Sequence, residues 1–142
     1  MVIELTTWTH ETYKMHFTGF HIEDEYKNFK LHTGLNTNTE PNNQYSTGMA
    51  KAFTDCNMMQ FTTKDRDNDQ WRIGNCADKR GGGWWFHHCS SANLNGKWYM
   101  YGSDDPASLI DGIFWQASGL NSARGTTNKI TLKEVTMRVQ VP

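Results

Sequence analysis

The chain lacks several features that would place it in a common class of protein. Its 142 residues contain no apolar run approaching the roughly 20 residues that span a bilayer. With 14 Lys and Arg against 15 Asp and Glu, it has no charge excess typical of nucleic-acid binding or a polybasic membrane anchor. Its first ten residues, MVIELTTWTH, lack the basic and apolar segments of a signal peptide. We therefore expect one domain with no membrane span and no nucleic-acid partner.

Signatures of catalysis are also missing. The sequence has no G-x-S-x-G motif, no H-E-x-x-H motif and no phosphate-binding loop, because the glycine run at 81–83 is not followed by Lys and Ser or Thr. The adjacent His87, His88 and Cys89 are a poor zinc site, since neighbours on an extended chain point opposite ways and zinc needs four ligands. We expect a protein that is not an enzyme.

Aromatic residues and glycine are plentiful instead. Six Trp, seven Phe, five Tyr and twelve Gly predict a loop-rich domain whose core is built on rings, with Trp84 and Trp85 inside it. Such a domain usually needs a covalent or metal cross-link. Three cysteines allow at most one internal disulfide and leave one thiol over.

Alternation of apolar and polar residues predicts strands at both ends of the chain. Residues 2–8, 13–17 and 29–32 alternate with period two and read as an antiparallel meander. A last strand begins at residue 130, but its apolar residues change parity midway. A β-bulge near Lys133 and Glu134 would bring both halves onto one face.

The middle of the chain shows little periodicity. Residues 34–55 are rich in Asn, Thr, Gly and Ser and are predicted to form a long loop. The only predicted helix is SDDPASLIDG, residues 103–112, with Asp105 as its cap and Pro106 at its first position. The expected fold is mainly β with long irregular loops, in the α+β class.

An acidic run, KDRDNDQWRIGNC, places Asp65, Asp67 and Asp69 at alternate positions. Carboxylates that converge on one point from a tight loop suit a hard divalent cation, above all calcium. The run is not an EF-hand, because it has neither the glycine nor the glutamate of that loop. The alternative is a solvated turn in which Asp and Asn bond their own backbone. Cys76 and Cys89 follow the acidic run. A disulfide between them would close a short loop and stabilise the fold by roughly 3 kcal/mol.

Several motifs follow one another in an order that identifies a family. They are MQFTTKDRDND, GNCA, GGGWWFHHC, ANLNGKWY, DGIFW and VTMRVQVP. This series resembles the fibrinogen C-terminal-like domains, which include the fibrinogen chains, ficolins, tachylectins, angiopoietins and angiopoietin-like proteins. The resemblance implies one domain over 1–142 that lacks the N-terminal part of the family's domain. It divides the chain into an antiparallel central sheet, 1–57 and 130–142, and a loop-rich calcium- and ligand-binding part, 58–129.

The resemblance also implies a metal site and a cross-link. Asp67 and Asp69 match the side-chain calcium ligands, the carbonyl of Trp71 matches another, and a carbonyl at Ile73 or Gly74 completes the set. Asp65 supports the site from outside it. The disulfide maps onto Cys76–Cys89, and the peptide between His88 and Cys89 is expected to be cis. Cys56 is additional to the family pattern, and is either a small buried residue or the site of an intermolecular disulfide in an oligomer.

The ligand pocket of the lectin members maps beside this disulfide. Its matching residues are Arg80, His88, Cys89, Ser90, Leu109 and Ile110. Arg80 stands where relatives have a tyrosine and Ser90 where they have a histidine, so the pocket is expected to be more polar than one that takes a plain acetyl group.

The resemblance implies a secreted, calcium-dependent lectin that binds acetylated glycans or glycoproteins. The alternatives are a receptor-binding module of the angiopoietin-like kind and a structural fragment of a larger assembly. Exposed rings beside a rigid loop would favour sugar binding, because sugars stack on them. Buried rings around an apolar hole would favour the other two functions.

Overall fold

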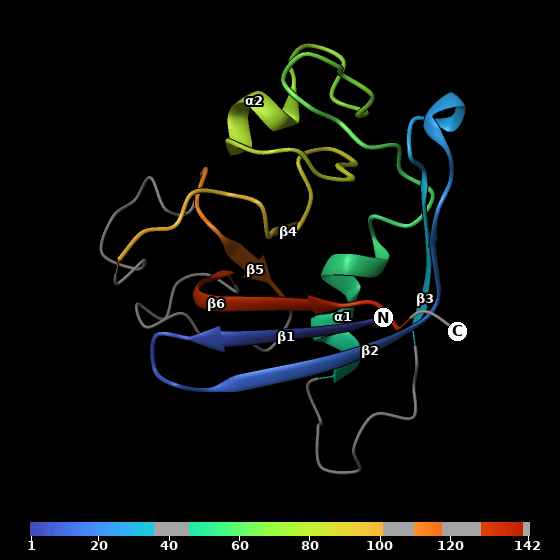
Figure 1. Ribbon diagram of the computed structural model, residues 1–142. Coiled ribbons are helices and arrows are strands. Elements are labelled where there is room, and N and C mark those ends of the chain that lie inside the picture. Colours follow the sequence, from blue (N-terminus) through green and yellow to red (C-terminus); the bar gives the residue numbers. More distant parts are fainter. Residues whose placement is uncertain (36–45, 101–109, 118–128, 141–142) are drawn as a thin grey trace.

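A six-stranded antiparallel sheet organises the chain. A computed structural model describes residues 1–35, 46–100, 110–117 and 129–140, and the structural statements below concern these. The strand order is β3-β2-β1-β6-β5-β4 (Figure 1). The strands are β1 (Val2–Thr7), β2 (Thr12–Ile22), β3 (Leu31–Leu35), β4 (Ala92–Asn93), β5 (Phe114–Gln116) and β6 (Lys129–Arg138). The predicted meander and the mainly β fold class are confirmed.

One face of the sheet carries the core and the other is polar. Ile3 pairs with Met15 across β1 and β2, and both are buried. On the other face Glu4 pairs with Lys14 and lies 3.6 Å from the guanidinium of Arg138. Cross-strand partners of opposite charge stabilise a solvated sheet surface. This face is therefore charged. A further layer of structure could pack only on an apolar face.

The predicted bulge lies in β6. Thr6 of β1 pairs with Glu134, whereas Thr7 pairs with Leu132, so Lys133 is the extra residue. The extra residue restores the alternation: Leu132 is buried, and Met137 packs against the core beyond the bulge. The change of parity seen in the sequence is therefore explained by one inserted residue.

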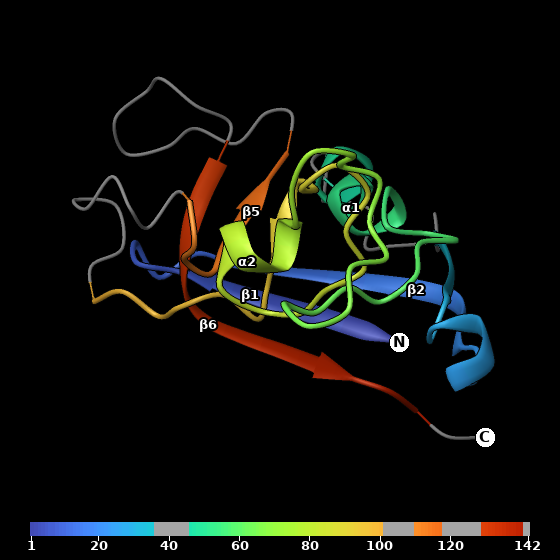
Figure 2. The same cartoon turned by 90° about the horizontal axis from the view of Figure 1, so that it is seen from above.

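A helix, α1 (Ser46–Thr54), occupies part of the segment predicted as a loop, so that prediction was wrong. Its buried residues Met49 and Phe53, with Cys56 after the helix, follow the three- and four-residue spacing of one helix face. Phe53 meets Phe17 of β2 at 4.9 Å between ring centroids. Figure 2 shows β5 and α1 on the same side of the β1–β2 hairpin, where the Trp115 indole donates to the carbonyl of Met49 at 2.9 Å.

Two short helical turns complete the described secondary structure. The 3-10 helix η1 (Glu25–Lys27) lies between β2 and β3, and α2 (Cys76–Arg80) follows the acidic run. The cap of α2 is Asn75, and Gly81 ends it with a left-handed φ of 76°. Neither turn was predicted. Asp105 and Pro106 of the predicted helix lie outside the described residues. No helix among the described residues is long and apolar enough to cross a membrane.

The loop-rich segment between α1 and β4 lies at the top of the molecule in Figure 1, together with α2. Trp84 and Trp85 of this segment belong to the core, as predicted. Two glycines before them allow close backbone contacts: a Cβ on Gly82 would overlap the carbonyl of Asn95, and one on Gly83 would lie 2.9 Å from the Phe61 ring. The strands β4 and β5 carry the 58–129 part into the same sheet.

Candidate functional site

The disulfide joins the start of α2 to the end of a tight turn. Cys76 and Cys89 are bonded, with 5.0 Å between their Cα atoms. Their pairing is the one implied by the family resemblance. The remaining cysteine, Cys56, is a free thiol with no exposed surface. This burial supports the interpretation of Cys56 as a small core residue over that of an intermolecular cross-link.

The turn from His87 to Ser90 holds strained backbone. Cys89 and Ser90 have φ values of 54° and 23°, a left-handed region that costs an L-residue about 1–2 kcal/mol. No described peptide bond is cis, so the prediction of a cis bond between His88 and Cys89 was wrong. The chain reverses through two left-handed residues instead. The Ser90 hydroxyl stabilises that reversal by accepting the backbone N–H of His87 at 3.0 Å.

Arg80, the last residue of α2, holds the turn from one side. Its Nε and Nη2 donate to the carbonyl of Cys89 at 3.2 and 2.9 Å, and its Nη1 donates to the carbonyl of Ile110 at 2.9 Å. Burial lowers the pKa of this guanidinium below its usual value. Arginine nonetheless stays charged at neutral pH. Arg80 thus fixes the Cys89 carbonyl and brings a positive charge beside it.

A cavity of about 460 Å³ opens beside this turn. It contains four of the residues that the family resemblance placed in the pocket, namely Arg80, His88, Cys89 and Ser90. Ile110 is exposed and contributes its carbonyl to Arg80 rather than a wall of the cavity. Leu109 lies outside the described residues. Sequence reasoning missed four lining residues: Asp55, His87, Ser91 and Gln116.

The cavity is polar and charged. No Trp, Tyr or Phe is among the described residues that line it. The large rings nearby, including Trp84, Phe86 and Trp115, are fully or almost fully buried. The part of the site that the structure describes therefore has neither an exposed aromatic platform nor an apolar wall.

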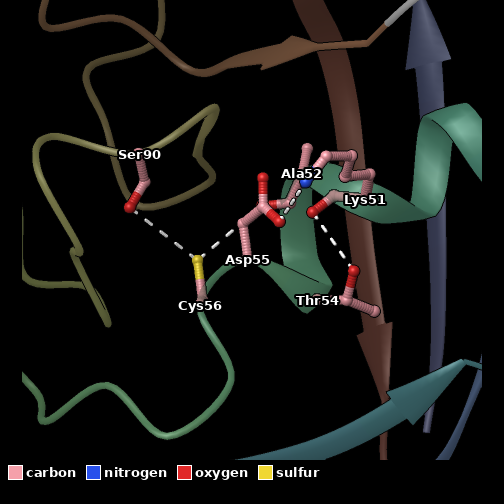
Figure 3. A network of polar contacts seen from close by, with 6 residues as sticks. All are labelled: Lys51, Ala52, Thr54, Asp55, Cys56 and Ser90. Carbon is pink, nitrogen blue, oxygen red and sulfur yellow. Dashed lines mark hydrogen bonds and ion pairs between the residues drawn. The ribbon is translucent and has the colours of Figure 1, made fainter.

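Cys56 lies behind the turn, where α1 ends. Figure 3 shows its sulfur directed at Ser90, 3.9 Å from the hydroxyl, with the carbonyl of Ala52 at 3.7 Å. Burial raises the pKa of Cys56 to about 11. The same view shows Asp55, which lines the cavity, paired with Lys51 at 2.6 Å. The thiol is therefore neutral at physiological pH, and the Asp55 charge is balanced by its own helix.

The acidic run forms a loop tied to the disulfide. Asp69 accepts the backbone N–H of Trp71 at 2.8 Å and that of Cys76 at 2.7 Å. Asp67 accepts the backbone N–H of Asp69 at 3.2 Å. The pKa of Asp69 is raised, mainly because the carboxylate is partly buried and also because the Asp67 carboxylate lies close by. Two neighbouring carboxylates in such a loop fit a hard divalent cation, whose charge would offset their repulsion.

The remaining predicted metal ligands are backbone groups. The Trp71 carbonyl accepts the N–H of Gly74 at 3.2 Å. A Cβ on Gly74 would lie 2.7 Å from the Trp71 ring, so a side chain there would displace that ring. Among the described residues, no group of three or more His, Cys, Asp or Glu side chains is arranged to hold a metal. The loop could therefore hold a cation only with two carboxylates, backbone carbonyls and water.

The Trp71 side chain connects this loop to the cavity. Its ring lies edge-on to His88, with 6.2 Å between the ring centroids, and the ammonium group of Lys79 lies 5.1 Å from the centroid of the Trp71 ring. Trp71 comes from the acidic loop, Lys79 from α2 and His88 from the cavity wall. The three elements therefore pack as one unit.

Known proteins of one family resemble this chain in sequence and in fold. The family described as fibrinogen beta and gamma chains, C-terminal globular domain, matches residues 1–141. Bovine fibroleukin is 35% identical over 87% of this chain and 27% of its own length, and the Xenopus laevis fibrinogen gamma chain is 29% identical over 98% and 32%. The chain thus spans about a third or less of the length of these curated relatives.

Solved structures agree with the family match. The fibrinogen-like globe domain of human ANGPTL2 matches with a TM-score of 0.70 and 31% identity, over 94% of this chain and 54% of that one. A lamprey fibrin D-dimer complexed with the peptide ligand Gly-His-Arg-Pro-amide matches with a TM-score of 0.63 and 26% identity, over 94% and 42%.

Proposed function

Because the chain belongs to the family of fibrinogen C-terminal globular domains, we propose that it is a secreted recognition module that binds a protein partner at the cavity beside the Cys76–Cys89 disulfide. The observation that carries the proposal is the cavity itself. A rigid turn, cross-linked through Cys89 and held by Arg80, presents polar groups without an ordering cost on binding.

The character of the cavity wall favours a protein partner. Its charged and hydrogen-bonding groups suit the side chains and backbone of a peptide segment. The described lining has no exposed indole or phenol ring on which a sugar could stack. The lamprey D-dimer of the same fold was solved with a peptide ligand, which supports the same kind of partner here.

Calcium has an indirect role in this proposal. Asp67 and Asp69 would hold the ion with backbone carbonyls of the loop, including that of Trp71. A bound calcium ion supplies positive charge that offsets the repulsion between the two carboxylates. With the loop fixed by the ion, Asp69 would hold Cys76 through its hydrogen bond, and the Trp71 ring would hold His88 through their edge-on contact. The ion orders the turn and does not touch the ligand.

A calcium-dependent lectin is the second candidate. The observation in its favour is the set of neutral hydrogen-bonding side chains in the cavity, from Ser90, Ser91 and Gln116. Hydroxyl and amide groups of this kind pair well with sugar hydroxyls and acetamido groups. The two candidates share one site and differ in the ligand.

Arrays of extracellular protein domains and of glycans, probed in parallel with and without calcium, test both. Wild-type chain is compared with Ser90→Trp, which fills the cavity, and with Thr136→Trp, which places the same ring on the polar face of the sheet. A protein ligand kept by Thr136→Trp and lost by Ser90→Trp supports the first candidate, and a glycan with this behaviour supports the second. Ligands that bind Ser90→Trp as well as wild type refute the site.

A further inference from the structure

We propose that His21 and His32, which face each other across β2 and β3, form a binding site for a divalent transition-metal ion, and that Cu²⁺ is the ion it binds most tightly. The site is separate from the cavity beside the disulfide, because neither histidine lines that cavity. Figure 1 shows η1, the light-blue turn of this hairpin, well apart from α2, whose last residue borders the cavity.

A bulge in β2 brings the two histidines opposite each other. Thr18 pairs with Gly34, whereas His21 pairs with His32, so two residues of β2 stand opposite one residue of β3. The first of the two, Gly19, has a left-handed φ of 59°, as glycine does in one common type of bulge. Without the extra residue the two histidines would lie on opposite faces of the sheet. The bulge therefore places both imidazoles on one face.

The two rings lie almost as close together as the ligands of one ion. Their centroids are 4.1 Å apart and their planes differ by 7°. With metal–nitrogen bonds of about 2.0–2.1 Å, two neighbouring ligand nitrogens lie roughly 2.8–3.4 Å apart in square-planar or tetrahedral coordination. Stacked rings reach this separation by tilting toward each other at one edge, so the strands need not move.

Glu23 orients one of the two rings. Its Oε1 lies 2.5 Å from the Nε2 of His32. An ionised carboxylate only accepts hydrogen bonds, so Nε2 carries the hydrogen and the lone pair of the neutral ring is on Nδ1. A carboxylate bonded to the far nitrogen is the usual partner of a metal-binding histidine, because it fixes the tautomer and makes the ring more basic. Glu23 therefore prepares His32 to bind an ion through Nδ1.

The nitrogens that would bind the ion are available. In the part of the chain that the structure describes, neither nitrogen of His21 forms a hydrogen bond, nor does the Nδ1 of His32. His21 is exposed, and the His32 side chain keeps 26% of its surface in contact with solvent. An ion can therefore reach both rings from solution.

The ligands decide which ion fits. Imidazole suits copper, zinc and nickel, and among these divalent ions Cu²⁺ binds most tightly to a given set of nitrogen and oxygen ligands. The described residues offer no group of three or more His, Cys, Asp or Glu side chains arranged to hold a metal, so water completes the coordination here. A structural zinc site needs four protein ligands. Two imidazoles with water suit the tetragonal coordination of Cu²⁺ better.

A titration of the chain with Cu²⁺ tests the proposal, in excess free glycine that removes ions from weaker sites. Calorimetry should give one ion per chain, and electron paramagnetic resonance should show two imidazole nitrogens on it. Glu23→Gln keeps a hydrogen-bond acceptor without the charge and should weaken binding about tenfold, the lower end of the effect for a partner of a ligating histidine. His21→Asn and His32→Asn should each weaken binding more than Glu23→Gln and remove one nitrogen from the spectrum.

His16→Asn is the matched control. It removes an imidazole from the same strand, opposite Val2 on the polar face of the sheet, and should leave binding unchanged. An equal loss in His16→Asn and His21→Asn would show general binding to surface histidines and overturn the site. So would Cu²⁺ binding that survives in the double variant of His21 and His32. If His32→Asn does not fold, the wild-type spectrum decides, and fewer than two imidazole nitrogens overturns the proposal. None of these outcomes affects the function proposed for the cavity.

Discussion

One carboxylate oxygen of Asp69 accepts the backbone N–H of Cys76 at 2.7 Å, while the other accepts that of Trp71 at 2.8 Å. The first bond joins the acidic loop to the disulfide, and the second fixes the residue whose ring meets His88. A change at the acidic loop therefore affects the cavity through two contacts, one at Cys76 and one at Trp71.

Calcium is expected to stabilise the fold. An ion that binds only the folded chain adds about 2.7 kcal/mol to the free energy of unfolding when its concentration is a hundred times Kd. Asp67→Asn should remove this gain, because it removes one of two charged ligands. Thermal unfolding in calcium and in a chelator measures the effect. Asp24→Asn, which lies outside the acidic loop and whose side chain makes no capping bond, is the matched control, and it should keep the gain. An equal loss in both variants would contradict the assignment of ligands.

The free thiol should be inert in the folded protein. Cys56 has no exposed surface, and burial raises its pKa to about 11, so very little thiolate forms at pH 8. A thiol reagent is expected to label one cysteine per chain in denaturant and none under native conditions. Peptide mapping of the unreduced protein should show Cys76 bonded to Cys89. Rapid native labelling of Cys56 would contradict its position behind the turn.

The lowered pKa of Lys129 predicts that the free energy of unfolding rises at alkaline pH. Its pKa in the folded chain is about 8, below the ordinary 10.5. Between these values the unfolded state binds more protons, so the free energy of unfolding increases with pH. Urea unfolding at pH 7 to 10 measures the slope, and the difference between wild type and Lys129→Met isolates this residue. A difference that does not change across this range would show that Lys129 is not desolvated.

Gly82 is expected to tolerate no side chain. A Cβ there would overlap the backbone carbonyl of Asn95, which cannot move aside like the end of a flexible side chain. Gly82→Ala should lower the free energy of unfolding by roughly 1–3 kcal/mol, the usual effect of overpacking. Gly19→Ala is the control, because a Cβ there meets nothing within 4 Å. Its cost should be limited to the strain of its left-handed φ of 59°.

Strand residues were predictable because their pattern is local. Met15 stands between Lys14 and His16, and Ile3 and Leu5 stand on either side of Glu4. This period of two is enough to place each apolar residue on one face of its strand. The bulge at Lys133 was predictable for the same reason, since only an extra residue reconciles the two parities of β6. The Cys76–Cys89 disulfide was predicted from the family resemblance, which rests on the order of the motifs. The same resemblance predicted the pocket residues Arg80, His88, Cys89 and Ser90.

The missed features depend on contacts between distant segments. The helix α1 carries Met49 and Phe53 at helical spacing, but an Asn-, Thr- and Ser-rich stretch before them resembles a loop. Asp55 and Gln116 enter the same cavity only because α1 packs against β5, far from it in the sequence. The left-handed turn at Cys89 reflects bonds from Arg80 and Ser90, which no local sequence pattern specifies.

The most direct measurement is a map of the ligand's footprint on the chain. The first protein ligand found on an array is titrated into nitrogen-15-labelled chain, and the shifted backbone amides are assigned. We predict shifts concentrated at 87–91, with the Arg80 side chain and Gln116. Shifts confined to β2 and β3, with residues 87–91 unchanged, would contradict it.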